Sequence, residues 1–224
     1  MKLEERKLQE QALSEPREPA DAHEADDSSG LQASLERLNA LPEAEAIESF
    51  LKCCGSKRWA REMSAGRPFH HAREMFEAAE RIWWNLQAED WLEAFRSHPK
   101  IGERKSAEPA SAESRRWSEE EQSGTRTASQ SALAELAEAN RAYEEKFGFI
   151  FIVCATGKTT EEMLALLRAR LPNDADSELR VAAEEQRRIT AIRLRKMLGE
   201  QSEEQSAVSV QQSAGSDAGG QMST

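Results

Sequence analysis

Hydrophobic and polar positions along most of this chain follow the period of an α-helix. Apolar residues recur every three or four positions, as they do on the buried face of an amphipathic helix. Stretches of this kind cover residues 31–40, 43–54, 57–63, 71–86, 89–97, 131–147, 159–171 and 177–198. The pattern therefore predicts an all-α fold, a single compact domain of about seven or eight helices.

Local start signals refine two of the helix boundaries. Thr159 and Glu162 have the spacing of a capping box, in which each side chain bonds the other residue's main chain at a helix start. Ser118 and Glu121 have the same spacing. We therefore expect a helix to start at Ser118, after a polar connection over residues 102–117.

One apolar run lacks the helical period. The segment FGFIFIV, residues 147–153, is rich in the aromatic and β-branched residues that favour a strand. No second segment of this type is available to pair with it, and a lone strand is not stable. We therefore expect a buried, extended linker instead of a sheet.

The two ends of the chain differ in composition from its centre. Residues 1–30 and 199–224 contain no aromatic residue, and the C-terminal stretch is rich in Ser, Gln and Gly. Such segments bury too little apolar surface to offset their loss of conformational entropy. We expect both to be disordered tails around a domain of residues 31–198.

Charge and cysteine content exclude several classes of protein. The formal net charge of -11 argues against a nucleic-acid partner. No apolar run is long enough for a membrane span, and no apolar segment of a secretory signal is present near the first residue. Cys53, Cys54 and Cys154 lack the spacing of a metal site. We expect a cytoplasmic protein with reduced thiols and no bound metal.

His98 lies at an unusual position, directly before Pro99. A residue that precedes proline is disfavoured in the α conformation, so the helix should end there. A histidine at a helix end can be purely structural, since it interacts favourably with the helix dipole. Its imidazole also titrates near neutrality, so a general acid or base is the functional interpretation.

Three more polar residues interrupt the pattern. Glu121 either caps the helix expected at Ser118 or lies in a site at that helix start. Arg193 falls on the apolar stripe of the last helix, where it either extends to the protein edge or lines a polar pocket. Asn140 also falls on an apolar stripe, and we favour a structural role for it.

Several segments together resemble one enzyme family. They are RIWWNL, DWLEAFRSHPKIGE, EEQSG, EANRAYEEKFGFIFIVCATG and ITAIRLRKML, and they span nearly all of residues 31–198 in order. The family is 2-oxo-4-hydroxy-4-carboxy-5-ureidoimidazoline (OHCU) decarboxylase, whose fold is all-α and whose members need no cofactor. One departure is that Lys100, Ile101 and Gly102 follow the His-Pro pair, where many members have an aspartate and Leu-Ala-Gly.

The resemblance implies a set of site residues. The catalytic residues would be His98, Glu121 and Arg193. Substrate-binding residues would come from the His-Pro pair, from the segment that ends in the Glu-Gln pair and from the main chain of FIVCA: Pro99, Ser118, Glu119, Glu120, Glu121, Gln122, Phe151, Ile152, Val153, Cys154 and Ala155.

The resemblance also implies an activity and an assembly. The expected reaction is decarboxylation of OHCU to (S)-allantoin, the last step from urate to allantoin, by a cytoplasmic homodimer. The competing hypothesis is a non-catalytic helical interaction module that keeps the scaffold and has lost the chemistry. Retention of His98, Glu121 and Arg193 together favours the enzyme.

Overall fold

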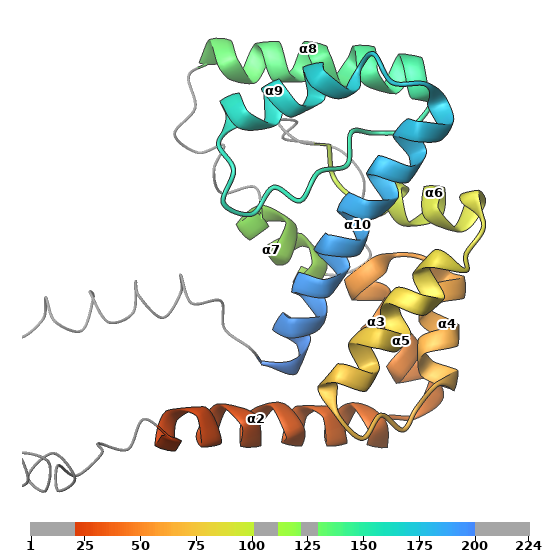
Figure 1. The fold of residues 1–224 in the computed structure, drawn as a ribbon, viewed down its shortest axis with the longest axis vertical. Helices are drawn as coiled ribbons and strands as arrows, with labels where there is room; N and C mark the ends of the chain where they lie inside the picture. Colours follow the sequence, from red (N-terminus) through yellow and green to blue (C-terminus); the bar gives the residue numbers. More distant parts are fainter. Residues whose placement is uncertain (1–20, 101–111, 122–129, 200–224) are drawn as a thin grey trace, which may run out of the picture.

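The computed structural model describes residues 21–100, 112–121 and 130–199 of the 224-residue chain (Figure 1). Its elements are α2 (Asp21–Ala40), α3 (Glu43–Cys54), α4 (Lys57–Ala65), α5 (Ala72–Trp84), α6 (Ala88–Arg96), α7 (Ala112–Glu121), α8 (Gln130–Phe147), α9 (Thr160–Arg170) and α10 (Ala175–Leu198). Within these ranges there is no strand, which confirms the predicted all-α fold. No helix in the described ranges combines the length and apolarity that a membrane span requires.

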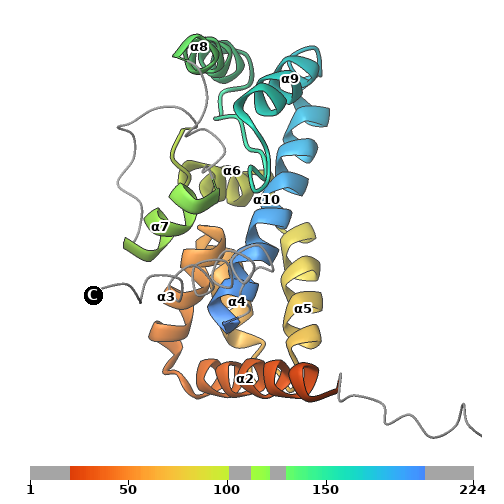
Figure 2. The ribbon, with the colours of Figure 1, turned by 90° about the vertical axis from the view of Figure 1, so that its left-hand side faces the viewer.

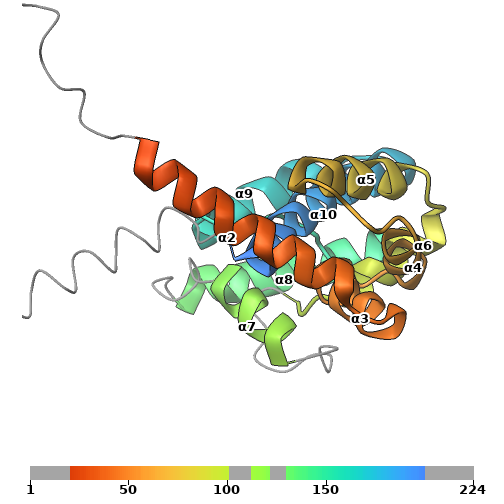
Figure 3. The same cartoon turned by 90° about the horizontal axis from the view of Figure 1, so that it is seen from below.

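The long helix α10 is the central element of the fold. It packs against α2, α3, α5 and α6. At the end where α10 begins, α8 and α9 pack against each other (Figures 1 and 2). At the other end α2 lies across the bundle, as the view from below shows (Figure 3). A polar side chain on α10 is therefore placed among elements from the whole length of the chain.

Buried tryptophans fix the packing of α4, α5, α6 and α10. An indole N–H needs a hydrogen-bond acceptor once it is removed from water. Trp59 donates to the carbonyl of Ala79, Trp83 to that of Ala183 and Trp91 to that of Trp83, each at 3.0 Å. The three bonds hold helices in register that hydrophobic contact alone would let slide.

Gly55 allows two helix ends to meet. It terminates α3 with a φ of +84°, a conformation that residues with a side chain rarely adopt. A Cβ atom at this position would lie 2.6 Å from the Cβ atom of Ser97, which follows α6. Glycine is thus required both for the turn and for the close approach of the segment that carries His98.

The apolar run after α8 is not helical. Residues 149–155 run between α8 and α9 without regular structure, and nearly all of them are buried. The rings of Phe149 and Phe151 pack on Tyr143, with centroids 5.9 and 5.3 Å apart. The predicted buried linker is confirmed, and we call residues 149–155 the linker below.

Two helix boundaries differ from the prediction. Ser118 does not begin a helix but lies inside α7, which starts at Ala112. The side chains of Trp117 and Ser118 are buried, so tertiary packing outweighs the weak local signal of the S-x-x-E pattern. In addition, α2 begins at Asp21, so the boundary predicted at Leu31 falls within this helix. The capping box at the start of α9 is confirmed.

A buried ionic network joins α8, α9 and α10. Glu178, which is fully buried, accepts hydrogen bonds on Oε1 from Arg170 Nε at 2.8 Å and Nη2 at 2.5 Å, and from the hydroxyl of Tyr143. Its Oε2 accepts from Asn173 at 2.7 Å. The remaining Arg170 nitrogen, Nη1, donates to the carbonyl of Ile152 in the linker at 2.8 Å. Every polar atom of this ion pair therefore has a partner.

Removing one member of this network should destabilise the fold strongly. We expect Glu178→Ala to lower the free energy of unfolding by about 3–5 kcal/mol, because Arg170 keeps its charge in an interior without a counterion. Glu135→Ala is the matched control, since it removes the half-exposed pair with Arg168 at 2.8 Å and should change stability by less than about 1 kcal/mol. Urea unfolding measures both, and equal effects would contradict the buried network.

Candidate active site

His98 is held on both sides by packed structure. Its main-chain N–H donates to the carbonyl of Phe95 at 3.1 Å, which closes the last turn of α6. The ring of Phe95 packs on that of Phe149 in the linker, with centroids 5.5 Å apart. Two residues after His98, Lys100 pairs with Glu144 of α8 at 2.7 Å. The backbone that aims the imidazole is thus fixed against α8 and the linker.

The His98 imidazole is buried and neutral. Only 9% of the residue is exposed, and its Nε2 atom has neither solvent contact nor a hydrogen bond within the described part of the chain. Burial and, second, the positive charge of Arg193 lower the pKa of His98 from 6.5 to about 3, while the side chain of Gln186 partly opposes this shift. The pKa therefore differs from the near-neutral value that the sequence suggested.

Arg193 brings a positive charge into the interior. It is 3% exposed, so it does not extend to the protein edge. Its Nη2 donates to Ser118 Oγ at 3.1 Å, which links α10 to α7. Its charge also lowers the pKa of the thiols of Cys53 and Cys54, although burial raises both overall. Arg193 of α10, Ser118 of α7 and His98, which follows the end of α6, are thus brought together.

Gln186 is a residue of this cluster that the sequence did not reveal. It is fully buried on α10, and its Oε1 atom has no hydrogen-bond partner among the described residues. Its amide nitrogen donates to Thr190 Oγ1 at 3.3 Å, and the Thr190 hydroxyl donates to the Gln186 carbonyl at 2.9 Å. These bonds orient the amide, so Oε1 is the atom left to face the imidazole of His98. A glutamine among Glu and Arg residues gives no sequence signal of burial.

The linker forms a second group of predicted site residues. Phe151, Ile152, Val153, Cys154 and Ala155 are all buried. Arg170 donates to the carbonyl of Ile152 at 2.8 Å, Glu185 accepts from the N–H of Cys154 at 2.7 Å, and Lys158 donates to the carbonyl of Cys154 at 2.7 Å. The main chain of this segment is therefore fixed by charged side chains.

The acidic segment of α7 divides into residues with different surroundings. Ser118 is buried against Arg193, whereas Glu119 is exposed. Glu120 pairs with Lys196 of α10 at 3.0 Å, so it acts as a tie between helices. Glu121 is the last residue of α7. Gln122 lies outside the described residues, and Pro99 is half-buried next to His98.

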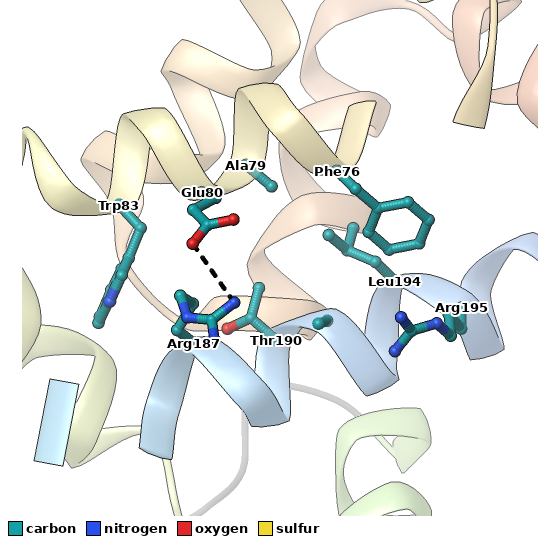
Figure 4. A pocket seen from close by; sticks show the side chains of 9 residues that line it. Phe76, Ala79, Glu80, Trp83, Arg187, Thr190, Leu194 and Arg195 are labelled. Atoms are coloured by element: carbon teal, nitrogen blue, oxygen red, sulfur yellow. Dashed lines mark ion pairs between the residues drawn. The ribbon is translucent and has the colours of Figure 1, made fainter. Parts of the chain in front are cut away.

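A separate groove lies between α5 and α10 (Figure 4). Its volume is about 180 Å³, and it is lined by Phe76, Ala79, Glu80, Trp83, Arg187, Thr190, Ala191, Leu194 and Arg195. The two arginines are already engaged: Arg187 pairs with Glu80 at 3.5 Å, and the Arg195 guanidinium lies 5.3 Å from the ring centroid of Phe76. Neither His98 nor Arg193 lines this groove.

Comparison with known proteins identifies relatives of this domain. Uric acid degradation bifunctional protein TTL of Arabidopsis thaliana is 44% identical over 149 residues, which are 66% of this chain and 46% of that protein. The chain thus spans about half the length of that relative. The 2-oxo-4-hydroxy-4-carboxy-5-ureidoimidazoline decarboxylase of Haloferax volcanii is 26% identical over 166 residues, covering 73% of this chain and 95% of that protein.

A solved structure and a family model agree with these relatives. A crystal structure of OHCU decarboxylase in the presence of (S)-allantoin superposes with a TM-score of 0.59 at 42% identity, covering 68% of this chain and 98% of that one. The family model for OHCU decarboxylase matches residues 39–195, which include His98, Ser118, the linker and Arg193. This chain therefore belongs to the OHCU decarboxylase family.

Proposed function

We propose that this chain catalyses the cofactor-independent decarboxylation of OHCU to (S)-allantoin, the last step from urate to allantoin. The observation that carries the proposal is the buried Arg193 guanidinium beside a buried, neutral His98. The related crystal structure, obtained in the presence of (S)-allantoin, supports the substrate class.

The reaction needs charge stabilisation and one controlled proton. Loss of carbon dioxide leaves an electron pair on the ring carbon, and the conjugated ring of the substrate accepts it. The protein then has to stabilise the negative charge and deliver a proton to one face. Arg193 supplies a planar guanidinium that can hold a carboxylate or a ring oxygen through two bonds. Its bond to Ser118 fixes the plane of that guanidinium.

His98 is suited to handle the proton because its charge state depends on what is bound. In the free protein, burial and Arg193 keep the imidazole neutral. A substrate carboxylate next to both groups favours the imidazolium and offsets the repulsion from Arg193. Binding of the anion thus raises the pKa of His98 in the complex, and we assign His98 the proton transfer that sets the product's handedness. Glu121 would orient the hydroxyl of the substrate or the imidazole.

The buried charge also separates the enzyme from a non-catalytic module. Removing an ion from water costs several kcal/mol, and a module that has lost the chemistry needs no guanidinium to bind a substrate anion. A surface module would be expected to hold an apolar residue at Arg193, which is 3% exposed. We therefore favour the enzyme over the interaction module.

We propose further that the enzyme acts as a cytoplasmic homodimer without a nucleic-acid or membrane partner. The net charge of -11 supports the absence of nucleic acid. The family resemblance supports the dimer. Residues 31–198 would carry the whole activity, with residues 1–30 and 199–224 as dispensable tails.

A coupled assay tests the proposed activity directly. Urate oxidase and hydroxyisourate hydrolase first convert urate to OHCU, and the purified chain is then added. Circular dichroism should show rapid formation of (S)-allantoin, against slow racemic product without the chain. A rate and handedness equal to those of the control without the chain would contradict the function.

Replacement of His98 should slow catalysis strongly while the fold persists. Glutamine is similar in size and can donate a hydrogen bond, but it cannot change protonation state. We expect His98→Gln to lower the rate by about 10²–10⁴-fold, the usual contribution of general acid–base catalysis. A structural helix-end histidine predicts near-normal turnover with a lower melting temperature, so rate and melting temperature are measured on the same sample.

Lysine should not be able to take over the function of Arg193. An ammonium keeps the charge but loses the planar pair of donors. We expect Arg193→Lys to reduce kcat/KM roughly tenfold or more, because a hydrogen bond to a charged group is worth about 1.5–3 kcal/mol. Arg195→Lys, an exposed position on the same helix, is the control and should leave the kinetics unchanged. Equal kinetics for both variants would remove Arg193 from the site.

The neutral imidazole should also make stability depend on pH. The pKa of His98 is about 3 in the folded chain and 6.5 as its ordinary value, so the unfolded chain binds the extra proton between these limits. The contribution of the neutral His98 imidazole to the free energy of unfolding is therefore complete above pH 6.5 and is lost as pH falls toward 3. From pH 7.5 to 5 the wild type should lose about 2 kcal/mol more than His98→Gln in urea unfolding. Parallel losses would contradict the neutral state.

A further inference from the structure

The linker is fixed at two points that lie on the same side of its main chain. In an extended segment, the polar groups of residues i and i+2 face the same side, and those of i+1 face the other. The carbonyl of Ile152 and both main-chain groups of Cys154 bond to side chains: Arg170, Glu185 and Lys158. These side chains belong to α9 and α10 and the turn before α9, so the even-numbered residues of the linker face that side.

The odd-numbered residues Val153 and Ala155 differ in their main-chain hydrogen bonds. No group in the described part of the chain accepts a hydrogen bond from the N–H groups of Val153 and Ala155, although both residues are buried. Buried N–H groups without a partner are uncommon and often mark a binding or catalytic position. The alternation of an extended chain places both on the side of the linker that faces away from α9 and α10, as a pair of donors.

We propose that Glu185 and Arg170 are positioning residues that clamp the linker and thereby direct the N–H groups of Val153 and Ala155 at an oxygen of the substrate. Glu185 holds the N–H of Cys154, and Arg170 holds the carbonyl two residues earlier. The Cys154 N–H is occupied by Glu185, so it is not one of the substrate donors. The proposal rests on the proposed function, because it assigns a task to the same site.

The clamp is itself fixed by neighbouring charges. Arg170 is held by the buried Glu178, and the second oxygen of Glu185 accepts from Arg188 at 3.0 Å. The carboxylate of Glu185 therefore cannot turn away from Cys154 without losing its pair with Arg188. The geometry of the two N–H donors is set before substrate binds, which is the condition for effective stabilisation of an oxyanion.

Glu185 allows a sharper test than Arg170, because its side chain is 14% exposed and pairs with the exposed Arg188, whereas Arg170 also holds the fully buried Glu178. Glu185→Ala removes the acceptor of the Cys154 N–H. Glu185→Asp keeps the charge but moves it back by one methylene group, out of reach of that N–H. Glu185→Gln keeps an oxygen acceptor at the same distance. Glu184→Ala is the matched control: Glu184 is the adjacent residue and pairs with Arg187 and Arg188, but no hydrogen bond joins it to the linker.

Steady-state kinetics and melting temperatures are measured for the wild type and all four variants in the coupled assay. We expect kcat/KM to fall about tenfold in Glu185→Ala and Glu185→Asp, which lose the hydrogen bond to Cys154, to fall less in Glu185→Gln, which keeps an oxygen acceptor but loses the charge, and to stay near the wild-type value in Glu184→Ala. If Glu185 acted through its negative charge alone, Glu185→Gln would be impaired as much as Glu185→Ala. The proposed clamp would be wrong if Glu185→Asp and Glu185→Ala had the same kinetics as Glu184→Ala at matched stability.

A binding measurement separates this inference from the proposed function. (S)-Allantoin is titrated into the ¹⁵N-labelled wild type, and the amide signals of the linker are followed by NMR. The signals of Val153 and Ala155 should shift more than that of Cys154. A larger shift at Cys154, or none at the odd-numbered residues, would overturn the inference whatever the coupled assay shows. If the wild type were inactive in the coupled assay but its linker amides shifted as expected, the proposed function would be wrong and the inference about the linker would stand.

Discussion

Burial of the Arg193 guanidinium next to the His98 imidazole is the interaction on which the rest of this structure depends. An ion in a protein interior is tolerated only where its surroundings are arranged for it. Here α10 carries the charge, α7 supplies the Ser118 hydroxyl, and α6 ends so that the imidazole lies within range of the charge. Cys53 and Cys54 remain protonated because burial raises the pKa of both thiols, that of Cys54 to about 12. His98, Cys53 and Cys54, whose ionisation the charge of Arg193 affects, are thus all neutral.

The second buried arginine, Arg170, pairs with a carboxylate inside the protein. Arg170 is neutralised by Glu178 within the protein, and its last donor holds the linker. This pair is a structural anchor, whereas we propose a functional role for the charge of Arg193. The two are coupled through the linker, since Phe149 contacts Phe95 on the helix that presents His98. The proposed reaction needs both kinds of site: a rigid frame, and a positively charged group that can bind the anionic substrate.

The sequence predicted those features that have a local signature. The helices follow from a strict apolar period, the linker from an aromatic run without that period, and the end of α6 from the His-Pro pair. Ser118 was assigned to a helix start because its spacing to Glu121 imitates a capping box, and only the burial of Trp117 reveals that α7 continues through it. Arg170, Glu178, Glu185 and Gln186 were missed for a common reason. Each is a polar residue on a helix with many charged neighbours, and its burial depends on contacts far away in the sequence. The pKa of His98 was likewise out of reach, because it depends on burial and on a charge 95 positions away along the chain, at residue 193.

The charge state of His98 in the free protein is the most direct test of this account. NMR of protein with ¹⁵N-labelled histidine reports the ionisation of each imidazole, and the spectrum of His98→Gln identifies the His98 signals among those of the four histidines. We expect a neutral ring from pH 8 down to about pH 5, because burial and Arg193 both oppose the imidazolium. Half-protonation near pH 6.5 would contradict it, since the imidazole would then be in contact with water and not under the influence of the buried guanidinium.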